Sequence, residues 1–174
     1  MSEAAPAVTP AGRLAFGLAA VLLAADQALK AWILYGLDLP TRVSTPVLGP
    51  LKLTMVWNEG VSFGFHQATH DLARWGLTAF ALVVALALAV WASRADRRLL
   101  GLALGLIIGG AVGNAIDRAR FGAVVDFIDV SAIGFFPWVF NLADSAITIG
   151  VILMLADSFR KETPRTPPPE EGAG

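Results

Sequence analysis

The 174-residue chain is 56% hydrophobic and only 16% charged, with a formal net charge of −1 and a mean hydropathy of +0.65. Average soluble domains carry about 25% charged residues, so this composition is typical of a membrane protein. The balanced charge indicates no nucleic-acid or polyanion partner, and the absence of cysteine excludes disulfides, thiolate catalysis and cysteine-ligated zinc.

The first predicted membrane span covers residues 14–37 and follows an Ala/Pro-rich segment, residues 1–12, that we expect to be a disordered tail. The span is too long and too charged for a cleaved signal peptide, because it carries Asp26 and Lys30. The acid precedes the base by four residues, which places an ion pair on one helix face. The pair makes two charges tolerable in the bilayer, supports a functional site by pinning this helix, or takes part in the chemistry directly.

Residues 38–70 form a polar interval that contains three prolines. Residues 51–57 alternate apolar and polar side chains and are rich in strand formers, and residues 58–64 are turn-prone, so we expect a small sheet over about 43–65 on the membrane surface. His66 and His70 lie at the end of this interval, but no acidic residue completes a zinc-helix pattern. A solvated loop is the better interpretation, and we predict no metal and no cofactor.

The second and third predicted spans, about 72–93 and 99–117, are joined by a short basic loop. Both are long enough to cross a hydrocarbon core of about 30 Å. Glycine recurs every four residues along the third span, a pattern that lets a neighbouring helix approach closely. The stripe consists of Gly101, Gly105, Gly109 and Gly113.

A second polar loop is expected over residues 118–136, with Pro137 in the first turn of a fourth span, residues 137–156, and a disordered tail over 159–174. The loop contains Asp126 within an apolar run, and Asp129, which we expect to be solvated. Asn141 and Asp144 fall near the start of the fourth span, and their spacing predicts that they share a helix face. Just before the loop, Asp117 and Arg118 are neighbours, and we expect them to form an ion pair.

Four spans place both termini on one side of the membrane. Seven of the thirteen Lys and Arg residues flank the spans on that side, which the positive-inside rule makes cytoplasmic. Because a helix rises about 1.5 Å per residue, nearly all the buried polar residues then fall at one level, just inside the outer interface. They are Asp26, Asn114, Asp117, Arg118, Asp126 and Asp144.

Two carboxylates in apolar surroundings indicate a function, because keeping them there is costly. Two such groups that lie close together share a proton, so that one acts as base on a water while the other hydrogen-bonds the carbonyl under attack. Asp126 and Asp144 are the candidate pair. The amides of Asn114 and Asn141 and the guanidinium of Arg118 could hold a peptide backbone.

Two alternatives come from other classes of protein. A proton- or ion-coupled transporter subunit would use Asp26, Asp117 and Asp144 as relay groups. Against this, the polar groups gather at one face of the bilayer rather than running across it. A non-catalytic membrane assembly factor would use the glycine stripe as a partner surface.

Five segments of the chain resemble motifs of the bacterial lipoprotein signal peptidases, or signal peptidase II. They are residues 26–30 (DQALK), 58–64 (NEGVSFG), 109–118 (GGAVGNAIDR), 124–127 (VVDF) and 140–144 (FNLAD), and the resemblance covers residues 14 to about 158. It implies an all-α membrane fold of four transmembrane helices, with a small periplasmic sheet called the cradle and a periplasmic helix.

The same resemblance implies an intramembrane aspartic endopeptidase of the bacterial inner membrane, acting as a monomer without a cofactor. Its substrates would be diacylglyceryl-prolipoproteins, cut immediately before the lipidated cysteine. The catalytic aspartates match Asp126 and Asp144. The implied substrate-binding residues are Asn58, Gly60, Asn114, Arg118 and Asn141, and the supporting residues are Asp26, Lys30 and Asp117.

Overall fold

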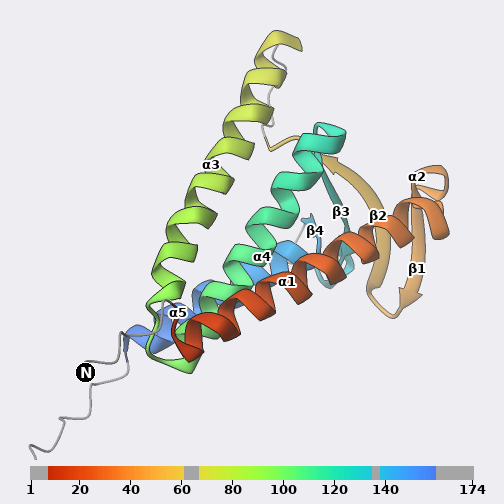
Figure 1. Ribbon diagram of the computed structural model, residues 1–174. Helices are drawn as coiled ribbons and strands as arrows, with labels where there is room; N and C mark the ends of the chain where they lie inside the picture. Colours follow the sequence, from red (N-terminus) through yellow and green to blue (C-terminus); the bar gives the residue numbers. More distant parts are fainter. Residues whose placement is uncertain (1–7, 61–66, 135–137, 160–174) are drawn as a thin grey trace, which may run out of the picture.

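A computed structural model describes residues 8–60, 67–134 and 138–159 as a helical bundle with a small sheet at one end (Figure 1). The helices are α1 (Pro10–Ala31), continued by a π-helical segment (Trp32–Gly36), then α2 (Leu39–Arg42), α3 (Gln67–Ser93), α4 (Arg98–Phe121) and α5 (Leu142–Ser158). The strands are β1 (Ser44–Leu48), β2 (Leu51–Asn58), β3 (Val124–Asp129) and β4 (Val139–Phe140), with a 3₁₀ turn (Ser131–Ile133) before β4.

Helix α4 is the centre of the bundle and packs against α1, α3 and α5. In its most apolar stretch 72% of the residues are buried, against 22% for α1 and 17% for α3. Among the described residues, three helical segments are long and apolar enough to cross a membrane: Pro10–Gly36, Asp71–Ser93 and Arg98–Phe121. The outward faces of α1 and α3 are therefore the surfaces that lipid would cover, and the chain is an integral membrane protein.

The glycine stripe lies where α1 crosses α4. A Cβ atom at Gly101 or Gly105 would come within 2.5 or 2.6 Å of the carbonyl oxygen of Ala11 or Ala15, respectively. Gly109 repeats the contact one turn further on, at 2.8 Å from the oxygen of Ala19. The predicted close approach of two helices is thus confirmed, and glycine on one helix faces alanine on the other.

The sheet is antiparallel, with strand order β1-β2-β3-β4. The first two strands match the sheet predicted over 43–65, whose last residues lie outside the described ranges. The prediction of a loop over 118–136 was wrong, because α4 runs on to Phe121 and β3 then pairs with β2. Val125 and Phe127 of β3 are buried against the end of the first helix, and this packing fixes the segment as a strand.

Two helix ends also differ from the predictions. Helix α1 already begins at Pro10, because the Thr9 hydroxyl oxygen accepts a hydrogen bond from the Gly12 N–H at 3.0 Å. Helix α5 begins at Leu142 rather than at residue 137. Pro137 itself lies outside the described residues.

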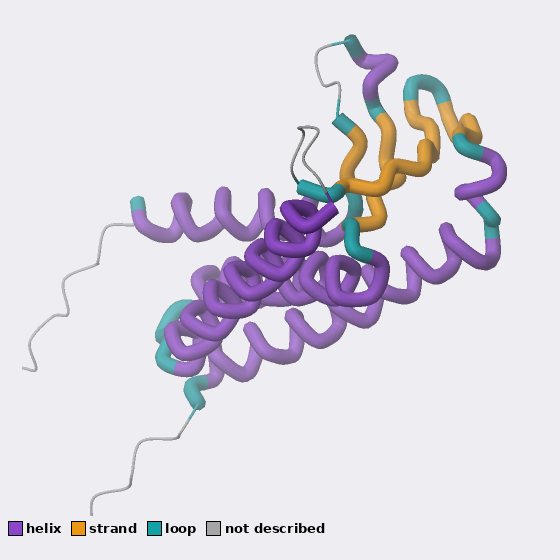
Figure 2. The backbone as a smooth tube through the Cα atoms, turned by 90° about the horizontal axis from the view of Figure 1, so that it is seen from above, coloured by secondary structure: helices purple, strands orange, loops and turns teal. Residues whose placement is uncertain are grey.

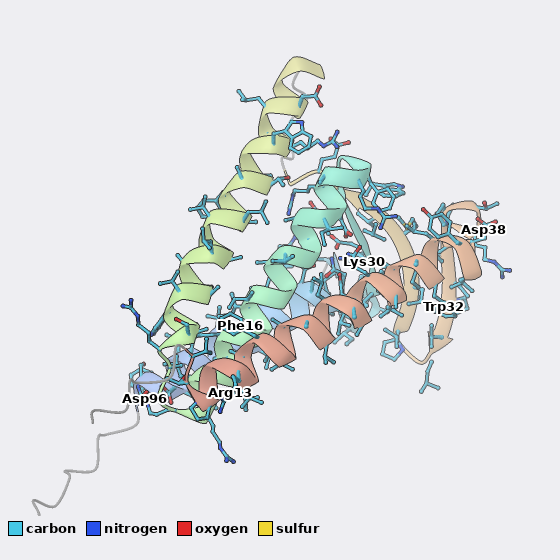
Figure 3. The ribbon with its side chains drawn as sticks, in the orientation of Figure 1. Arg13, Phe16, Lys30, Trp32, Asp38 and Asp96 are labelled. Atoms are coloured by element: carbon cyan, nitrogen blue, oxygen red, sulfur yellow. The ribbon has the colours of Figure 1, made fainter. Side chains whose placement is uncertain are left out.

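The sheet lies at one end of the bundle, and both described chain ends lie at the opposite end (Figures 1 and 2). The backbone N–H of Thr9 donates to the carbonyl of Ser93 at 3.1 Å, and Arg97 forms an ion pair with Asp157 at 3.0 Å. The α3–α4 connection therefore lies against both the start of α1 and the end of α5. In Figure 3, Arg13 and Asp96 mark this end, whereas Asp38 marks the sheet end.

Candidate active site

Asp126 lies on β3, opposite Val56 of β2, and is 1% exposed. Two asparagine amides reach its carboxylate. The NH₂ group of Asn58, at the end of β2, donates to Oδ2 at 2.9 Å, and that of Asn141 donates to Oδ1 at 2.6 Å. Because neighbouring residues on a strand point to opposite faces, packing of Val125 and Phe127 under the first helix turns Asp126 away from them, towards these amides.

Asp144 lies in the first turn of α5, where it forms a reciprocal capping box with Asn141. The Asn141 amide oxygen accepts from the Asp144 N–H at 2.9 Å, and Asp144 Oδ2 accepts from the Asn141 N–H at 3.2 Å. The other oxygen, Oδ1, accepts from the NH₂ group of Asn114 at 2.7 Å. A helix N-terminus favours a negative charge. The prediction that Asn141 and Asp144 share a helix face was wrong, because Asn141 is the extended residue that precedes the helix.

The two carboxylates are joined through Asn141, whose side chain reaches Asp126 and whose backbone reaches Asp144. Burial raises the pKa of Asp126 to about 6, hydrogen bonds from Asn58 and Asn141 lower it, and the negative charge of Asp144 raises it. The structure thus brings the predicted pair into one electrostatically coupled cluster.

Beneath this pair lies a buried charge cluster made by Lys30, Asp26 and Asp117. The Lys30 ammonium is 2.8 Å from Asp26 Oδ2 and 2.7 Å from Asp117 Oδ2, and these side chains are at most 3% exposed. The predicted pairing of Asp26 with Lys30 is confirmed. The predicted pairing of Asp117 with Arg118 is wrong, because Lys30 of α1 is the residue that forms the ion pair with Asp117 of α4.

Gly60 and Arg118 meet beside the carboxylates. Gly60 has φ +78° and donates its N–H to the Asn58 amide oxygen at 2.9 Å. A Cβ atom at this position would lie 2.7 Å from Leu77 Cδ1 and 3.4 Å from the Arg118 guanidinium, so both side chains pack closely on Gly60. Within the described ranges, Arg118 Nε is buried and has no hydrogen-bond partner. A guanidinium that has an unused N–H donor beside two carboxylates can donate a hydrogen bond to a carbonyl oxygen of a bound peptide.

Two residues of this region were missed or misjudged from the sequence. Arg74 of α3 donates to the carbonyls of Arg118 and Ala119, both at 2.7 Å, and so caps the end of α4. Gly122, with φ +84°, was the available sequence signal for a helix end that needs such partners.

The prediction that Asp129 is solvated was wrong, because its side chain is only 7% exposed. Hydrogen bonds from Ser131 and Thr54 lower its pKa to about 2.

The structure describes the backbone position of one of the two histidines. His70 belongs to α3 rather than to a loop, and His66 lies outside the described residues. Within the described part of the chain, no group of three His, Cys, Asp or Glu side chains could hold a metal ion.

An apolar cavity of about 360 Å³ adjoins Asp144. Its remaining walls are Phe140, Ser145, Thr148 and Ile149. The hydroxyls of Ser145 and Thr148 donate to carbonyls of their own helix, at 3.0 and 2.9 Å, so their polar groups are already satisfied. The cavity therefore presents an apolar surface next to a carboxylate.

Known proteins resemble this chain over most of its length. The family described as Signal peptidase (SPase) II matches residues 18–160. The chain is 51% identical to the lipoprotein signal peptidase of Caulobacter vibrioides, over 89% of this chain and 92% of that protein. It is 47% identical to that of Methylorubrum extorquens, over 87% and 89%. A solved bacterial membrane enzyme superposes with a TM-score of 0.69 at 28% identity, covering 84% of this chain and 93% of the other.

The fold and these matches define an integral membrane peptidase, a hydrolase of the inner membrane. Within that class, the chain belongs to the signal peptidase II family. Membership confirms the predicted resemblance and does not support a transporter subunit.

Proposed function

We propose that the chain is an intramembrane aspartic endopeptidase that removes the signal peptide of diacylglyceryl-modified prolipoproteins, immediately before the lipidated cysteine. The observation that carries the proposal is the joining of Asp126 and Asp144 through Asn141 at the end of the bundle. The lipoprotein signal peptidases that the chain resembles supply the substrate class. The pair needs neither a metal nor a cofactor for hydrolysis.

In this mechanism the two carboxyl groups share one proton. The ionised one takes a proton from water, and the water oxygen attacks the carbonyl carbon of the scissile peptide bond. The protonated one donates its proton to the carbonyl oxygen, and a tetrahedral diol forms. The C–N bond then breaks as the leaving nitrogen receives a proton, which yields a carboxylic acid and a free amine.

The surrounding residues would hold the scissile peptide bond next to the two carboxylates. Arg118, with its unused Nε, would bind a substrate carbonyl. Gly60 would let the peptide backbone approach, since it has no side chain there. Asn58, Asn114 and Asn141 would bind substrate from the positions where they now contact the carboxylates.

The apolar cavity beside Asp144 suits an acyl chain or an apolar signal-peptide residue. We infer that α5 is a fourth span, because its 17 residues extend about 25 Å. We also infer that the end of the bundle near Arg13 and Arg97 is cytoplasmic, since basic residues concentrate there. The sheet and the site would then face the periplasm. We also infer that the protein acts as a monomer.

The proposal is tested by cleavage of a purified diacylglyceryl-prolipoprotein, followed by gel shift, with Asp126→Asn and Asp144→Asn variants. Both should lose at least about 1,000-fold in kcat, as expected when a group of the reacting dyad is removed. Asp157→Asn is the matched control, because Asp157 is also a buried acid but lies at the opposite end of the bundle. It should cleave normally.

Membrane insertion and thermal stability are measured for each variant, so that unfolding is separated from loss of chemistry. Cleavage retained by the Asp126→Asn variant or by the Asp144→Asn variant would exclude the substituted residue from the dyad. A wild-type enzyme that cuts the same precursor without its diacylglyceryl group at an equal rate would overturn the substrate assignment.

A further inference from the structure

Three asparagine side chains surround the carboxylates, and all three turn their NH₂ groups towards them. Asn58 and Asn141 donate to Asp126, at 2.9 and 2.6 Å. Asn114 donates to Asp144 at 2.7 Å. An amide can be rotated by 180° at little steric cost, so something must fix each orientation.

Each amide oxygen is held by a separate donor. The oxygen of Asn58 accepts from the N–H of Gly60, and that of Asn141 accepts from the N–H of Asp144, both at 2.9 Å. These two donors belong to the backbone. Within the described residues, both donors to the oxygen of Asn114 are side chains.

The amide oxygen of Asn114 accepts hydrogen bonds from the Lys30 ammonium, at 3.3 Å, and from the NH₂ group of Asn141, at 3.2 Å. A rotated Asn114 would place its NH₂ group against these two donors, and its oxygen against the Asp144 carboxylate. Both contacts would be repulsive. Of these two donors, only Lys30 carries a charge and cannot accept a hydrogen bond.

We propose that Lys30 is a positioning residue for peptide hydrolysis, whose ammonium fixes the amide of Asn114 so that its NH₂ group stays directed at Asp144. The inference rests on the proposed function of Asp126 and Asp144. Lys30 acts through Asn114, because its side chain is 3% exposed and its three N–H donors are directed at Asp26, Asp117 and Asn114.

The two acids that pair with Lys30 also contact the backbone beside the dyad. Asp26 accepts from the N–H of Ala143 at 3.1 Å, one residue before Asp144. Asp117 accepts from the N–H of Val125 at 3.2 Å, one residue before Asp126. The remaining polar and charged neighbours are Gln27, which donates to both acids, and Arg118, which lies within electrostatic reach of Asp117, Asp126 and Asp144.

The test compares Lys30→Met, which has no charge and no donor, with Lys30→Arg, which keeps both. We expect Lys30→Met to lower kcat about 10- to 100-fold, as loss of a residue that orients a reacting group does, with KM unchanged. Lys30→Arg should recover at least part of this loss. Arg97→Met is the control, since it also leaves a buried acid unpaired, Asp157, but far from the site. It should lower thermal stability and leave kcat unchanged.

A double-mutant cycle with Asn114→Ala separates positioning from support of the fold. If Lys30 acts through Asn114, then Lys30→Met should change the kcat of the Asn114→Ala enzyme by less than about twofold. A second loss as large as the first would overturn the proposal, as would an unchanged kcat in Lys30→Met.

Lys30→Met leaves two buried carboxylates without a cation, which can prevent folding. The triple variant Asp26→Asn, Lys30→Met, Asp117→Asn removes those charges and keeps similar shapes. It should fold and show the same loss of kcat, whereas wild-type kcat in this variant would overturn the proposal. Cleavage by Asp126→Asn or Asp144→Asn would instead refute the proposed function.

Discussion

Replacement of Gly105 by alanine tests the close contact between α1 and α4. The added Cβ would lie 2.6 Å from the carbonyl oxygen of Ala15, whereas ordinary contact begins at 3.4 Å, so the two helices must separate by about 0.8 Å. Overpacking of this kind costs about 1–3 kcal/mol, and the better helix propensity of alanine returns up to about 1 kcal/mol. We expect a net loss of up to about 2 kcal/mol, or up to about 8 °C in Tm.

Thermal unfolding of the purified protein in detergent measures this loss. Gly17→Ala and Gly76→Ala are the matched controls, because both positions are helical and no atom lies within 4 Å of the new Cβ. Both controls should be at least as stable as the wild type. A Gly105→Ala protein as stable as these controls would refute the reasoning that backbone contact, rather than chance, places glycine in this stripe.

Two further predictions concern pH. Because burial raises the pKa of Asp126 to about 6 and the dyad needs one proton, kcat/KM should fall as pH rises through about 6. Asn58→Ala should move this fall in kcat/KM to higher pH, since the substitution removes a hydrogen bond that lowers the pKa of Asp126. A fall at the same pH or at a lower pH would contradict the role of Asn58. Asp129 has its pKa lowered to about 2, so its stabilising effect is present above about pH 4 and is lost between about 4 and 2. Thr54→Val, followed by thermal unfolding, should therefore destabilise the protein at pH 7 and approach the wild type as pH falls towards 2, whereas a constant difference would contradict this linkage.

The spacing of residues predicted those parts of the fold that depend on one helix and its neighbour. The pairing of Asp26 with Lys30 follows from their i,i+4 separation, and the approach of α1 to α4 follows from the glycine stripe. The depth of the polar residues in the membrane follows from the helix rise per residue. That depth identified Asp126 and Asp144 as a candidate pair. These features need no knowledge of the remaining contacts.

Other parts depended on partners that lie far away in the sequence. Residues 124–129 became a strand because β2 pairs with them and the end of the first helix covers them, and no local pattern contains that information. Asp117 took Lys30 as its partner in place of its neighbour Arg118, because a charge buried between helices is stabilised by the cation that shares its surroundings. The capping box, in contrast, could have been predicted from local sequence. Asn141 and Asp144 have the spacing of a helix start, which we interpreted instead as a shared helix face.

That capping box affects the choice of variant at the candidate dyad. Asp144 contributes an acceptor for the Asn141 N–H, and its own N–H is held by Asn141, so the residue both starts α5 and serves the proposed chemistry. Asp144→Ala would remove a cap, at about 1 kcal/mol, together with the carboxylate. Asp144→Asn keeps one accepting oxygen for the cap, and it removes the negative charge and the ability to hold or release a proton. Loss of cleavage in the asparagine variant at unchanged stability therefore reports on chemistry, whereas the same loss in the alanine variant combines the two effects.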